Sequence, residues 1–447
     1  MAQRKYFGTD GIRGTANQGV MTADTALKLG MAAGNLFTRG EHRHRVIIGK
    51  DTRLSGYMFE NAITSGFLSA GMDVFLVGPM PTPAIAMLVK SMRADLGVMI
   101  SASHNPCYDN GLKLFGPDGH KLSDKKEKEI EEIMMNLQSI KLARPENVGR
   151  ATRIDDAPGR YIEHIKNSFP KGHDLEGFKI VIDCANGAAY HLGGKIFWEL
   201  GAEVIELAVK PNGENINLNC GSNHIEILSE TVIKNKASLG IALDGDADRI
   251  QMVDENGKPV DGDKILALIA CYLKRHDLLN KNTIVATFMS NLGMEKFLNS
   301  QNIEVIYTQV GDRYVAAKMK ELGLSLGGEQ SGHIIVGDYA TTGDGLVAAL
   351  QMLALIKEEN KPLSEVANIF TPFPQFLRNI PVSDPNILDQ ENVKKSIKMA
   401  EEKILGNGRL LVRKSGTENL IRIMVESEDI SLINKVINSI DEAIRTK

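Results

Sequence analysis

Short runs of β-branched and other apolar residues alternate with longer stretches of helical character along most of the chain. In the N-terminal part we expect helices at residues 22–38 and 57–70, and buried strands at 46–49, 74–78 and 96–100. Strands that alternate with helices are typical of layered α/β domains. The pattern therefore predicts an α/β unit in this part of the chain.

The same alternation returns further along. A strand is expected at 179–183, and the helical segment behind it leads into apolar residues at 201–205. Two more strands are expected at 283–287 and 304–308. Three such blocks suggest three related α/β domains, although no strict sequence period proves a repeat.

The chain changes character at residues 360–385. Prolines are dense there, which indicates a linker or an extended lead into a final unit. Beyond it we expect a helix at 389–405, two strands around 413–417 and a terminal helix from about Ile430, which together predict a small α+β domain. The prolines of the segment are Pro362, Pro372, Pro374, Pro381 and Pro385.

Length and composition narrow the class of protein. The 447 residues fit about three domains of ordinary size. Apolar residues make up 43% and charged residues 24% of the chain, a globular composition that excludes a wholly disordered protein. The formal net charge of −4 argues against a general nucleic-acid or membrane-surface binder, so any anion site must arise locally.

The cysteines and the apolar runs indicate in which cellular compartment the protein is expected. Cys107, Cys184, Cys220 and Cys271 lie far apart and form no CxxC pair, so we expect neither a disulfide framework nor a zinc site. The first residues have no apolar signal-peptide core, and no uncharged apolar run reaches about 18 residues. We therefore expect a cytoplasmic protein without a membrane span.

The first candidate for chemistry follows the expected strand at 96–100. Residues 101–106 place Ser103 on a turn, exposed and with His104 beside it. Loops at the carboxyl ends of strands are where α/β domains bind ligands. A simple surface turn is the competing interpretation, because neighbours in sequence often point apart.

The second candidate is a group of aspartates at alternate positions, Asp244, Asp246 and Asp248. Such close carboxylates repel one another without a cation, and their oxygens suit Mg²⁺ or Ca²⁺. An EF-hand loop starting at Asp244 would need glycine where the chain has Arg249, and the flanks are expected to be strands. We therefore favour Mg²⁺, with a solvated acidic turn as the alternative.

The third candidate is the glycine-rich segment 327–333. Its glycines allow close backbone approach, and Glu329, Ser331 and His333 carry groups that recognise sugar hydroxyls. A glycine-rich connection without a ligand is equally consistent with this spacing.

The fourth candidate is the segment 413–419. Its cations, hydroxyls and glycine would make a phosphate-binding nest, with a basic hairpin as the alternative. The chain contains neither a GxxxxGK nor a GxGxxG sequence, so ATP and NAD are not indicated.

Taken together, these segments resemble the α-D-phosphohexomutases over essentially the whole chain. Each block alone is weak evidence, whereas all of them in this order are specific. Gln330, where many relatives carry methionine, and residues 310–314 point to the members that act on glucosamine phosphate. The shared blocks are 7–14, 100–106, 243–249, 327–333 and 413–419.

The resemblance implies an α/β fold with three similar α/β domains of mixed sheets and a smaller C-terminal α+β domain around a central cleft. We expect these domains at 1–155, 156–257, 258–370 and 371–447. In that order they would carry a phosphoserine loop, an Mg²⁺-binding aspartate loop, a sugar-recognition loop and a phosphate clamp.

The resemblance also implies residue roles. Ser103 would be phosphorylated in the active enzyme, and the aspartate triplet would bind Mg²⁺ together with a phosphoserine oxygen. The sugar would be contacted by Glu329, Ser331 and His333. The clamp on the non-reacting phosphate would consist of Arg413, Ser415, Gly416, Thr417 and Arg422.

The implied reaction interconverts glucosamine 6-phosphate and glucosamine 1-phosphate through a 1,6-bisphosphate that turns over in the cleft. This would supply UDP-N-acetylglucosamine and cell-wall precursor synthesis. The sequence does not rank His104, Lys113 and His333 as the base. Two phosphates carry about −3 to −4, so cations from several domains are expected: Arg13, Lys113, Arg249, Arg413 and Arg422.

Other functions stay open on the sequence alone. Phosphomannomutase/phosphoglucomutase activity, a non-catalytic sugar-phosphate binding protein and a phosphatase are the alternatives. The intact serine and aspartates argue against a protein that only binds. The expected partner is a small hexosamine phosphate, without nucleic acid or membrane, and homodimers are common among the relatives. Closure of the last domain at a hinge near 370–374 would exclude water.

Overall fold

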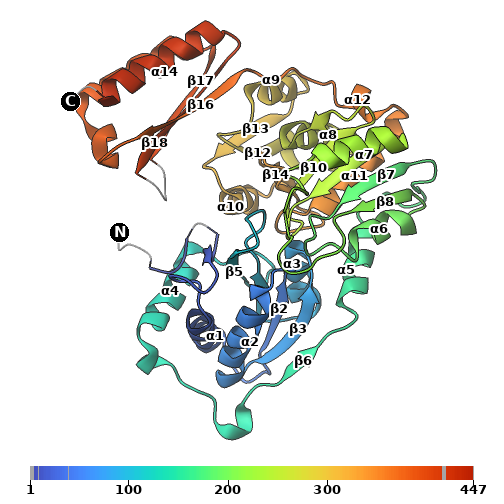
Figure 1. Ribbon diagram of the computed structural model, residues 1–447, viewed down its shortest axis with the longest axis vertical. Coiled ribbons are helices and arrows are strands. Elements are labelled where there is room, and N and C mark those ends of the chain that lie inside the picture. Colours follow the sequence, from blue (N-terminus) through green and yellow to red (C-terminus); the bar gives the residue numbers. More distant parts are fainter. Residues whose placement is uncertain (1–4, 9, 39, 415–418, 446–447) are drawn as a thin grey trace.

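The computed structural model describes residues 5–8, 10–38, 40–414 and 419–445 (Figure 1). Four sheets follow one another along the chain, and each has its own helices. Three of these units have mixed sheets between helices, and the fourth is a smaller α+β unit. The predicted fold class is therefore confirmed, while the exact domain boundaries stay predictions. Within the described residues, no helix is both long and apolar enough to cross a membrane.

Unit 1 has a sheet in the order β1-β5-β4-β2-β3-β6. Its elements are β1 (Ile12–Thr15), α1 (Ala23–Phe37), β2 (Arg45–Lys50), α2 (Ser55–Ser69), β3 (Asp73–Pro79), α3 (Thr82–Ser91), β4 (Leu96–Ile100), β5 (Asp109–Phe115), α4 (Asp124–Met135) and β6 (Ala151–Arg153). The two predicted helices and three predicted strands are all present. β2 lies parallel to both β3 and β4, whereas β5 is antiparallel to its neighbours.

Alternation along β2 buries both faces of this sheet. Val46 and Ile48 join a core with α1 and α2, while Ile47 packs on the opposite side with Ile85 and Val89 of α3. The second face belongs to a core that continues into the next two units. Unit 1 is therefore fixed against its neighbours by apolar packing.

Unit 2 has a mixed sheet in the order β11-β10-β9-β7-β8. Its elements are α5 (Ala157–Lys166), β7 (Lys179–Asp183), α6 (Gly193–Glu199), β8 (Glu203–Leu207), α7 (Glu226–Asn235), β9 (Leu239–Leu243), β10 (Ile250–Asp254) and β11 (Pro259–Val260). β7 is parallel to β8 and β9, and β10 returns antiparallel to β9.

Unit 3 has a mixed sheet in the order β13-β12-β14-β15. Its elements are α8 (Gly262–Arg275), β12 (Thr283–Thr287), α9 (Leu292–Ser300), β13 (Glu304–Thr308), α10 (Asp312–Leu322), β14 (Leu326–Gly328), β15 (Ile334–Val336), α11 (Gly345–Glu359) and α12 (Leu363–Val366). The helix α11 is buried along most of its length and belongs to the core shared with units 1 and 2.

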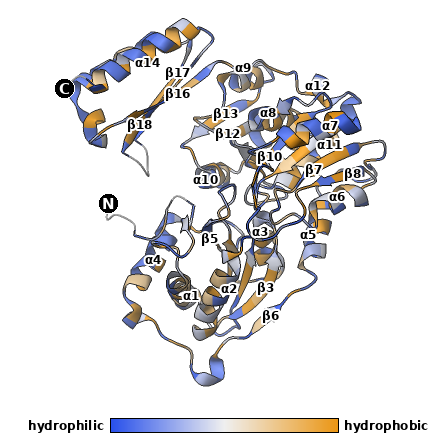
Figure 2. Ribbon diagram, viewed as in Figure 1, coloured by the Kyte–Doolittle hydropathy of each residue, from blue (hydrophilic) through white to orange (hydrophobic). Residues whose placement is uncertain are grey.

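Unit 4 is an antiparallel sheet in the order β16-β18-β17 with two helices on it. Its elements are β16 (Gln375–Pro381), α13 (Glu391–Ile404), β17 (Gly408–Lys414), β18 (Leu420–Ser427) and α14 (Ile430–Arg445). Polar and apolar residues alternate along α14 (Figure 2), and the apolar ones pack in a separate core with Ile421 and Val425. This separate core makes unit 4 a body distinct from the other three. Short 3₁₀ turns lie at Leu137–Ser139, Pro145–Asn147, Asn280–Asn282 and Pro385–Asp389.

Candidate active site

Three of the predicted loops begin where strands of the three α/β units end. The Ser103 loop follows β4, Asp244 directly follows β9 and Glu329 directly follows β14. A cavity of about 520 Å³ forms where these loops of the three α/β units meet. Eight of the site residues predicted from the sequence line this cavity: Arg13, Ser103, His104, Asp248, Arg249, Glu329, Ser331 and His333.

The backbone at Ser103 adopts a conformation that non-glycine residues rarely accept. Its φ is +53°, in the left-handed region, and such strain is concentrated at functional sites. The Ser103 hydroxyl donates to Asp244 Oδ2, and His104 Nδ1 lies 3.3 Å from Ser103 Oγ. The sequence predicted an exposed turn, whereas Ser103 is only 1% exposed because the loop of unit 2 covers it.

Two residues that the sequence did not single out hold this loop. Arg53 and Asn217 both donate to Ser103 O, at 3.1 and 2.8 Å, and both donate to Asn105 O, at 2.5 and 3.0 Å. Arg53 is fully buried and paired with Asp51. In the sequence, Arg53 could have been found from the charged pair that it forms with Asp51, directly after the buried strand β2. The contacts of Asn217, which come from another unit, left no signal in the sequence.

Gly245 lets the serine loop and the aspartate loop approach each other. A Cβ atom at this position would lie 2.6 Å from Ser103 O, closer than real Cβ contacts allow. The backbone oxygen of Gly245 also accepts a hydrogen bond from the Ala188 N–H at 2.8 Å. The close approach of these backbones brings the Ser103 hydroxyl to the aspartates.

The three aspartates form a buried cluster of oxygen ligands. Their exposed fractions are between 0% and 3%, so the solvated acidic turn is excluded. One oxygen from each lies within 4.8 Å of the others. Burial and the charges of Asp248 and Asp246 raise the pKa of Asp244 well above its usual value.

Two oxygens of this cluster lack a hydrogen-bond partner in the described part of the chain. Asp246 Oδ1 and Asp248 Oδ1 are buried and accept no hydrogen bond from any described residue. A buried carboxylate oxygen that accepts no hydrogen bond destabilises the folded protein. Three carboxylates and a hydroxyl are the hard donors that Mg²⁺ prefers, so the residues present fit this ion.

Lys113 contacts the aspartate cluster. Its Nζ lies 2.8 Å from Asp246 Oδ2 and 3.6 Å from oxygens of both Asp10 and Asp248. Burial disfavours the ammonium charge, but these carboxylates outweigh it and raise the pKa of Lys113. A lysine that stays protonated fits the predicted role of a cation and argues against the predicted alternative role of a base.

The two histidines differ in pKa and in hydrogen bonding: although burial opposes it, the carboxylates of Asp248 and Asp312 raise the pKa of His333. The Gly343 N–H donates to His333 Nε2 at 2.9 Å, and Nδ1 lies 3.7 Å from Asp248, so both ring nitrogens of His333 are engaged. Burial and the nearby Arg249 and Arg13 lower the pKa of His104 to about 4. His104 is therefore neutral at physiological pH, and its Nδ1 faces Ser103.

A chain of charges links units 1 and 3 at the cavity. Lys121 donates to Asp10 Oδ1 at 2.6 Å and also pairs with Asp312, at the start of α10. The ammonium of Lys121 helps to hold the pKa of both carboxyls below its usual value, against the effect of burial. Lys121 was not predicted, whereas both aspartates lie in blocks that carried the family resemblance.

The predicted sugar loop reaches the same cavity. Glu329 is 8% exposed, and its Oε1 accepts a hydrogen bond from the Gly311 N–H at 3.0 Å. Burial raises the pKa of Glu329. Ser331 is exposed at the cavity wall, where its hydroxyl can meet a ligand.

The predicted phosphate clamp lies on unit 4. Arg413 of β17 is the cross-strand partner of Arg422 of β18, and burial together with this neighbouring charge lowers the pKa of Arg413. Ser415, Gly416 and Thr417 lie outside the described residues. Of the described residues that line the cavity, none belongs to unit 4.

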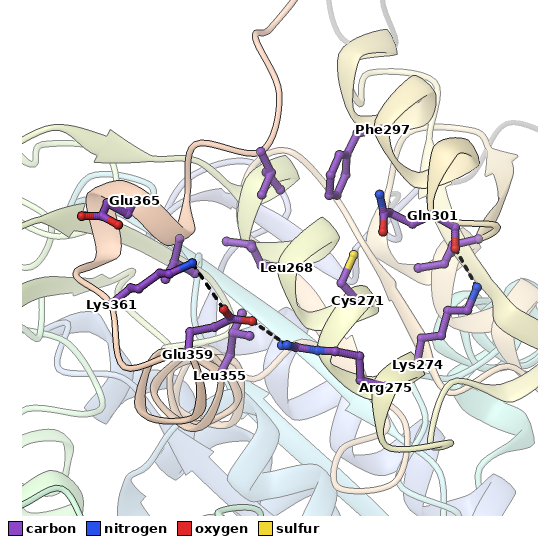
Figure 3. A pocket seen from close by; sticks show the side chains of 13 residues that line it. Leu268, Cys271, Lys274, Arg275, Phe297, Gln301, Leu355, Glu359, Lys361 and Glu365 are labelled. Carbon is purple, nitrogen blue, oxygen red and sulfur yellow. Dashed lines mark hydrogen bonds and ion pairs between the residues drawn. The ribbon is translucent and has the colours of Figure 1, made fainter.

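A second cavity of about 520 Å³ lies in unit 3, between α8, α9 and α11 (Figure 3). Its apolar lining includes Leu268, Cys271 and Phe297, and an Arg275–Glu359 ion pair lies beside them. Burial raises the pKa of the Cys271 thiol to about 11, so this cysteine is not an activated nucleophile. None of the predicted site residues lines this cavity, which separates it from the candidate active site.

Comparison with known families covers the chain almost from end to end. Four models of phosphoglucomutase/phosphomannomutase domains match it, each in the expected order. These are α/β/α domain I at residues 4–141, domain II at 159–257, domain III at 261–373 and the C-terminal domain at 377–443.

Individual proteins give the same result. A phosphoglucosamine mutase from Gluconacetobacter diazotrophicus is 59% identical over 441 residues, which are 99% of this chain and 98% of that protein. The structure of a phosphoglucomutase/phosphomannomutase family protein from Burkholderia thailandensis matches with a TM-score of 0.83 at 23% identity, covering 100% and 98% of the two chains. The Aspergillus fumigatus N-acetylphosphoglucosamine mutase in complex with GlcNAc-6P and magnesium matches with a TM-score of 0.68 at 17% identity, covering 98% and 95%.

Proposed function

The chain belongs to the phosphoglucomutase/phosphomannomutase family, and we propose that it is an isomerase that interconverts glucosamine 6-phosphate and glucosamine 1-phosphate. The full-length similarity to a phosphoglucosamine mutase supports this substrate. The observation that carries the chemistry is the buried Ser103 hydroxyl, which contacts the aspartate cluster at a cavity built by three units.

In the proposed reaction Ser103 carries a phosphoryl group. The free sugar hydroxyl forms a bond to phosphorus as the bond from Ser103 Oγ to phosphorus breaks, which gives a 1,6-bisphosphate. We assign the proton transfer to His104, whose Nδ1 lies 3.3 Å from Ser103 Oγ at the cavity wall: it takes the proton of the sugar hydroxyl and gives it to Ser103 Oγ as that oxygen leaves phosphorus. After the bisphosphate has turned over, the same bond changes in reverse return the other phosphoryl group to Ser103.

The residues around Ser103 prepare it for transfer. Arg53 and Asn217 hold the two loop carbonyls, so the Oγ atom keeps its position through both half-reactions. Asp244, Asp246 and Asp248 would hold Mg²⁺, which supplies charge stabilisation to phosphoryl oxygens when it is bound. Glu329, Ser331 and His333 would contact the sugar.

The charge of the cavity explains why a clamp from unit 4 is needed. A bisphosphate carries about −3 to −4, and the ammonium groups of Lys113 and Lys121 are already paired with carboxylates. The adjacent guanidinium groups of Arg413 and Arg422 would supply the missing charge when unit 4 closes over the cavity. The described lining residues present four carboxylates against two guanidinium groups: Asp10, Asp248, Asp312 and Glu329 against Arg13 and Arg249.

Substrate comparison tests this function. We expect kcat/KM for glucosamine 6-phosphate to exceed the values for glucose 6-phosphate and mannose 6-phosphate, each measured with the matching 1,6-bisphosphate as activator. Equal or higher values for glucose or mannose phosphates would instead make the protein a phosphoglucomutase or phosphomannomutase. Release of inorganic phosphate at the turnover rate would make it a phosphatase.

A further inference from the structure

Two histidines and an aspartate converge at the edge of the first sheet that lies opposite the active site. His42 and His44 precede β2, and Asp95 directly precedes β4. Because β2 and β4 are parallel neighbours, their starting ends share one edge of the sheet. The five residues of β4, at about 3.3 Å each, place roughly 16 Å of strand between Asp95 and the Ser103 loop.

The donor atoms of this cluster lie at distances that suit a shared metal ion. Asp95 Oδ1 is 2.9 Å from His42 Nε2 and 3.4 Å from His44 Nδ1. One donor atom from each residue lies within 4.8 Å of the others. In a tetrahedral site with bonds of about 2.1 Å, neighbouring donors are about 3.4 Å apart.

His44 provides an independent sign of a missing ligand. Its side chain is 4% exposed, its Nδ1 has Asp95 Oδ1 at 3.4 Å without good hydrogen-bond geometry, and its Nε2 makes no hydrogen bond within the described part of the chain. Buried polar atoms in proteins almost always have a partner. An ion between His44 and Asp95 would give His44 Nδ1 a partner where water has little access.

The surroundings orient the carboxylate and leave access from solvent. Asp95 Oδ2 accepts the Arg45 N–H at 2.8 Å, which leaves Oδ1 turned toward both imidazoles. Such a fixed carboxylate is a common supporting feature of metal sites. The His42 side chain is 62% exposed, so an ion can reach the cluster.

We propose that His42, His44 and Asp95 bind a divalent transition-metal ion of the Zn²⁺ type, separate from the Mg²⁺ site. Two imidazoles and one carboxylate are ligands that Zn²⁺ accepts, with water in the fourth position. Mg²⁺ prefers oxygen ligands in octahedral geometry and does not compete well here. The expectation of no zinc site rested on the cysteines, which take no part in this cluster. The ion ties the segment before β2 to the start of β4 and stabilises unit 1.

Titration of the full-length protein with Zn²⁺ in saturating Mg²⁺ tests the proposal. We expect one Zn²⁺ to bind, and the affinity to fall at least about tenfold in both His44→Ala and His42→Ala. The exposed His224 gives the matched control, His224→Ala, which should bind as the wild type does. Zn²⁺ should raise the melting temperature of the wild type and the control but not of the two variants.

Two further measurements separate this site from the aspartate cluster. Co²⁺ in place of Zn²⁺ should give the strong visible absorption of a tetrahedral site with nitrogen ligands, and Asp246→Asn should keep that band. His42→Ala should keep wild-type mutase activity, which shows that the fold is intact even if His44→Ala fails to fold. Wild-type Zn²⁺ affinity in His42→Ala, or loss of the Co²⁺ band in Asp246→Asn alone, would overturn the proposal.

Discussion

Replacing Arg53 by methionine tests how the Ser103 loop is held. The change removes the buried ion pair with Asp51 and the hydrogen bonds to Ser103 O and Asn105 O. Both carbonyls keep a hydrogen bond from Asn217. The main loss is therefore the partner of the Asp51 carboxylate, which is almost fully buried.

The size of the effect follows from that lone carboxylate. Breaking a buried ion pair by removing one partner costs about 3–5 kcal/mol, and hydrogen bonds from a charged donor add to this without full additivity. We expect a loss of about 4 kcal/mol in the free energy of unfolding. At about 3 °C per kcal/mol for a unit of this size, the melting temperature should fall by about 12 °C.

The double variant Asp51→Asn/Arg53→Met separates stability from catalysis. It leaves no lone buried charge, so calorimetry should show that most of the melting temperature returns. Turnover of glucosamine 6-phosphate should stay low, because the loop carbonyls still lack Arg53. Arg43→Met is the matched control, because Arg43 pairs with Asp73 at the surface, where such pairs contribute little to stability. An unchanged melting temperature in Arg53→Met, or full turnover in the double variant, would refute this reasoning.

Four other changes give distinct outcomes. Ser103→Ala should abolish turnover even with added bisphosphate while the melting temperature stays near that of the wild type; residual normal turnover would remove Ser103 from the reaction. Asp246→Asn should raise the Mg²⁺ concentration for half-maximal activity at least about tenfold, with weaker Mg²⁺ binding by calorimetry, and an unchanged Mg²⁺ response would make the triplet structural. His104→Gln should lower kcat far more than it changes KM, whereas an effect on KM alone would assign His104 to binding. Burial raises the pKa of Asp344 to about 6, above about 3.9 in an unfolded chain. The folded state therefore holds that proton more tightly, and stability falls as the pH rises from about 4 to about 6. Asp344→Asn should remove about 3 kcal/mol of this pH dependence, measured by urea unfolding at both pH values; an identical pH dependence in both proteins would contradict the assignment.

The strands and helices were largely predictable because their signals are local. β2 and β4 are short apolar runs, and α1 and α2 lie within a residue or two of their expected bounds. β16 was missed because it lies inside the proline-rich segment. An edge strand can end in a proline such as Pro381, since its outer N–H groups need no partner in the sheet.

The active site was predictable where residue type alone points to chemistry. The aspartate triplet has such a signature, whereas the role of the serine came only from the family resemblance; the structure brings the two into contact. The burial of Ser103 was not predictable, because it depends on a close approach at Gly245 in another unit. Arg53 and Asn217 were missed for the same reason: their contacts join segments that are far apart in sequence.

The most direct test of the account follows one phosphoryl group through Ser103. The enzyme is labelled by incubation with a 1,6-bisphosphate that carries radioactive phosphate, and peptide mapping locates the label. We expect the label on Ser103 alone, and its transfer to hexosamine phosphates when unlabelled glucosamine 6-phosphate is added. Label on another residue, label that stays on the protein during turnover, or label released as inorganic phosphate would contradict the account.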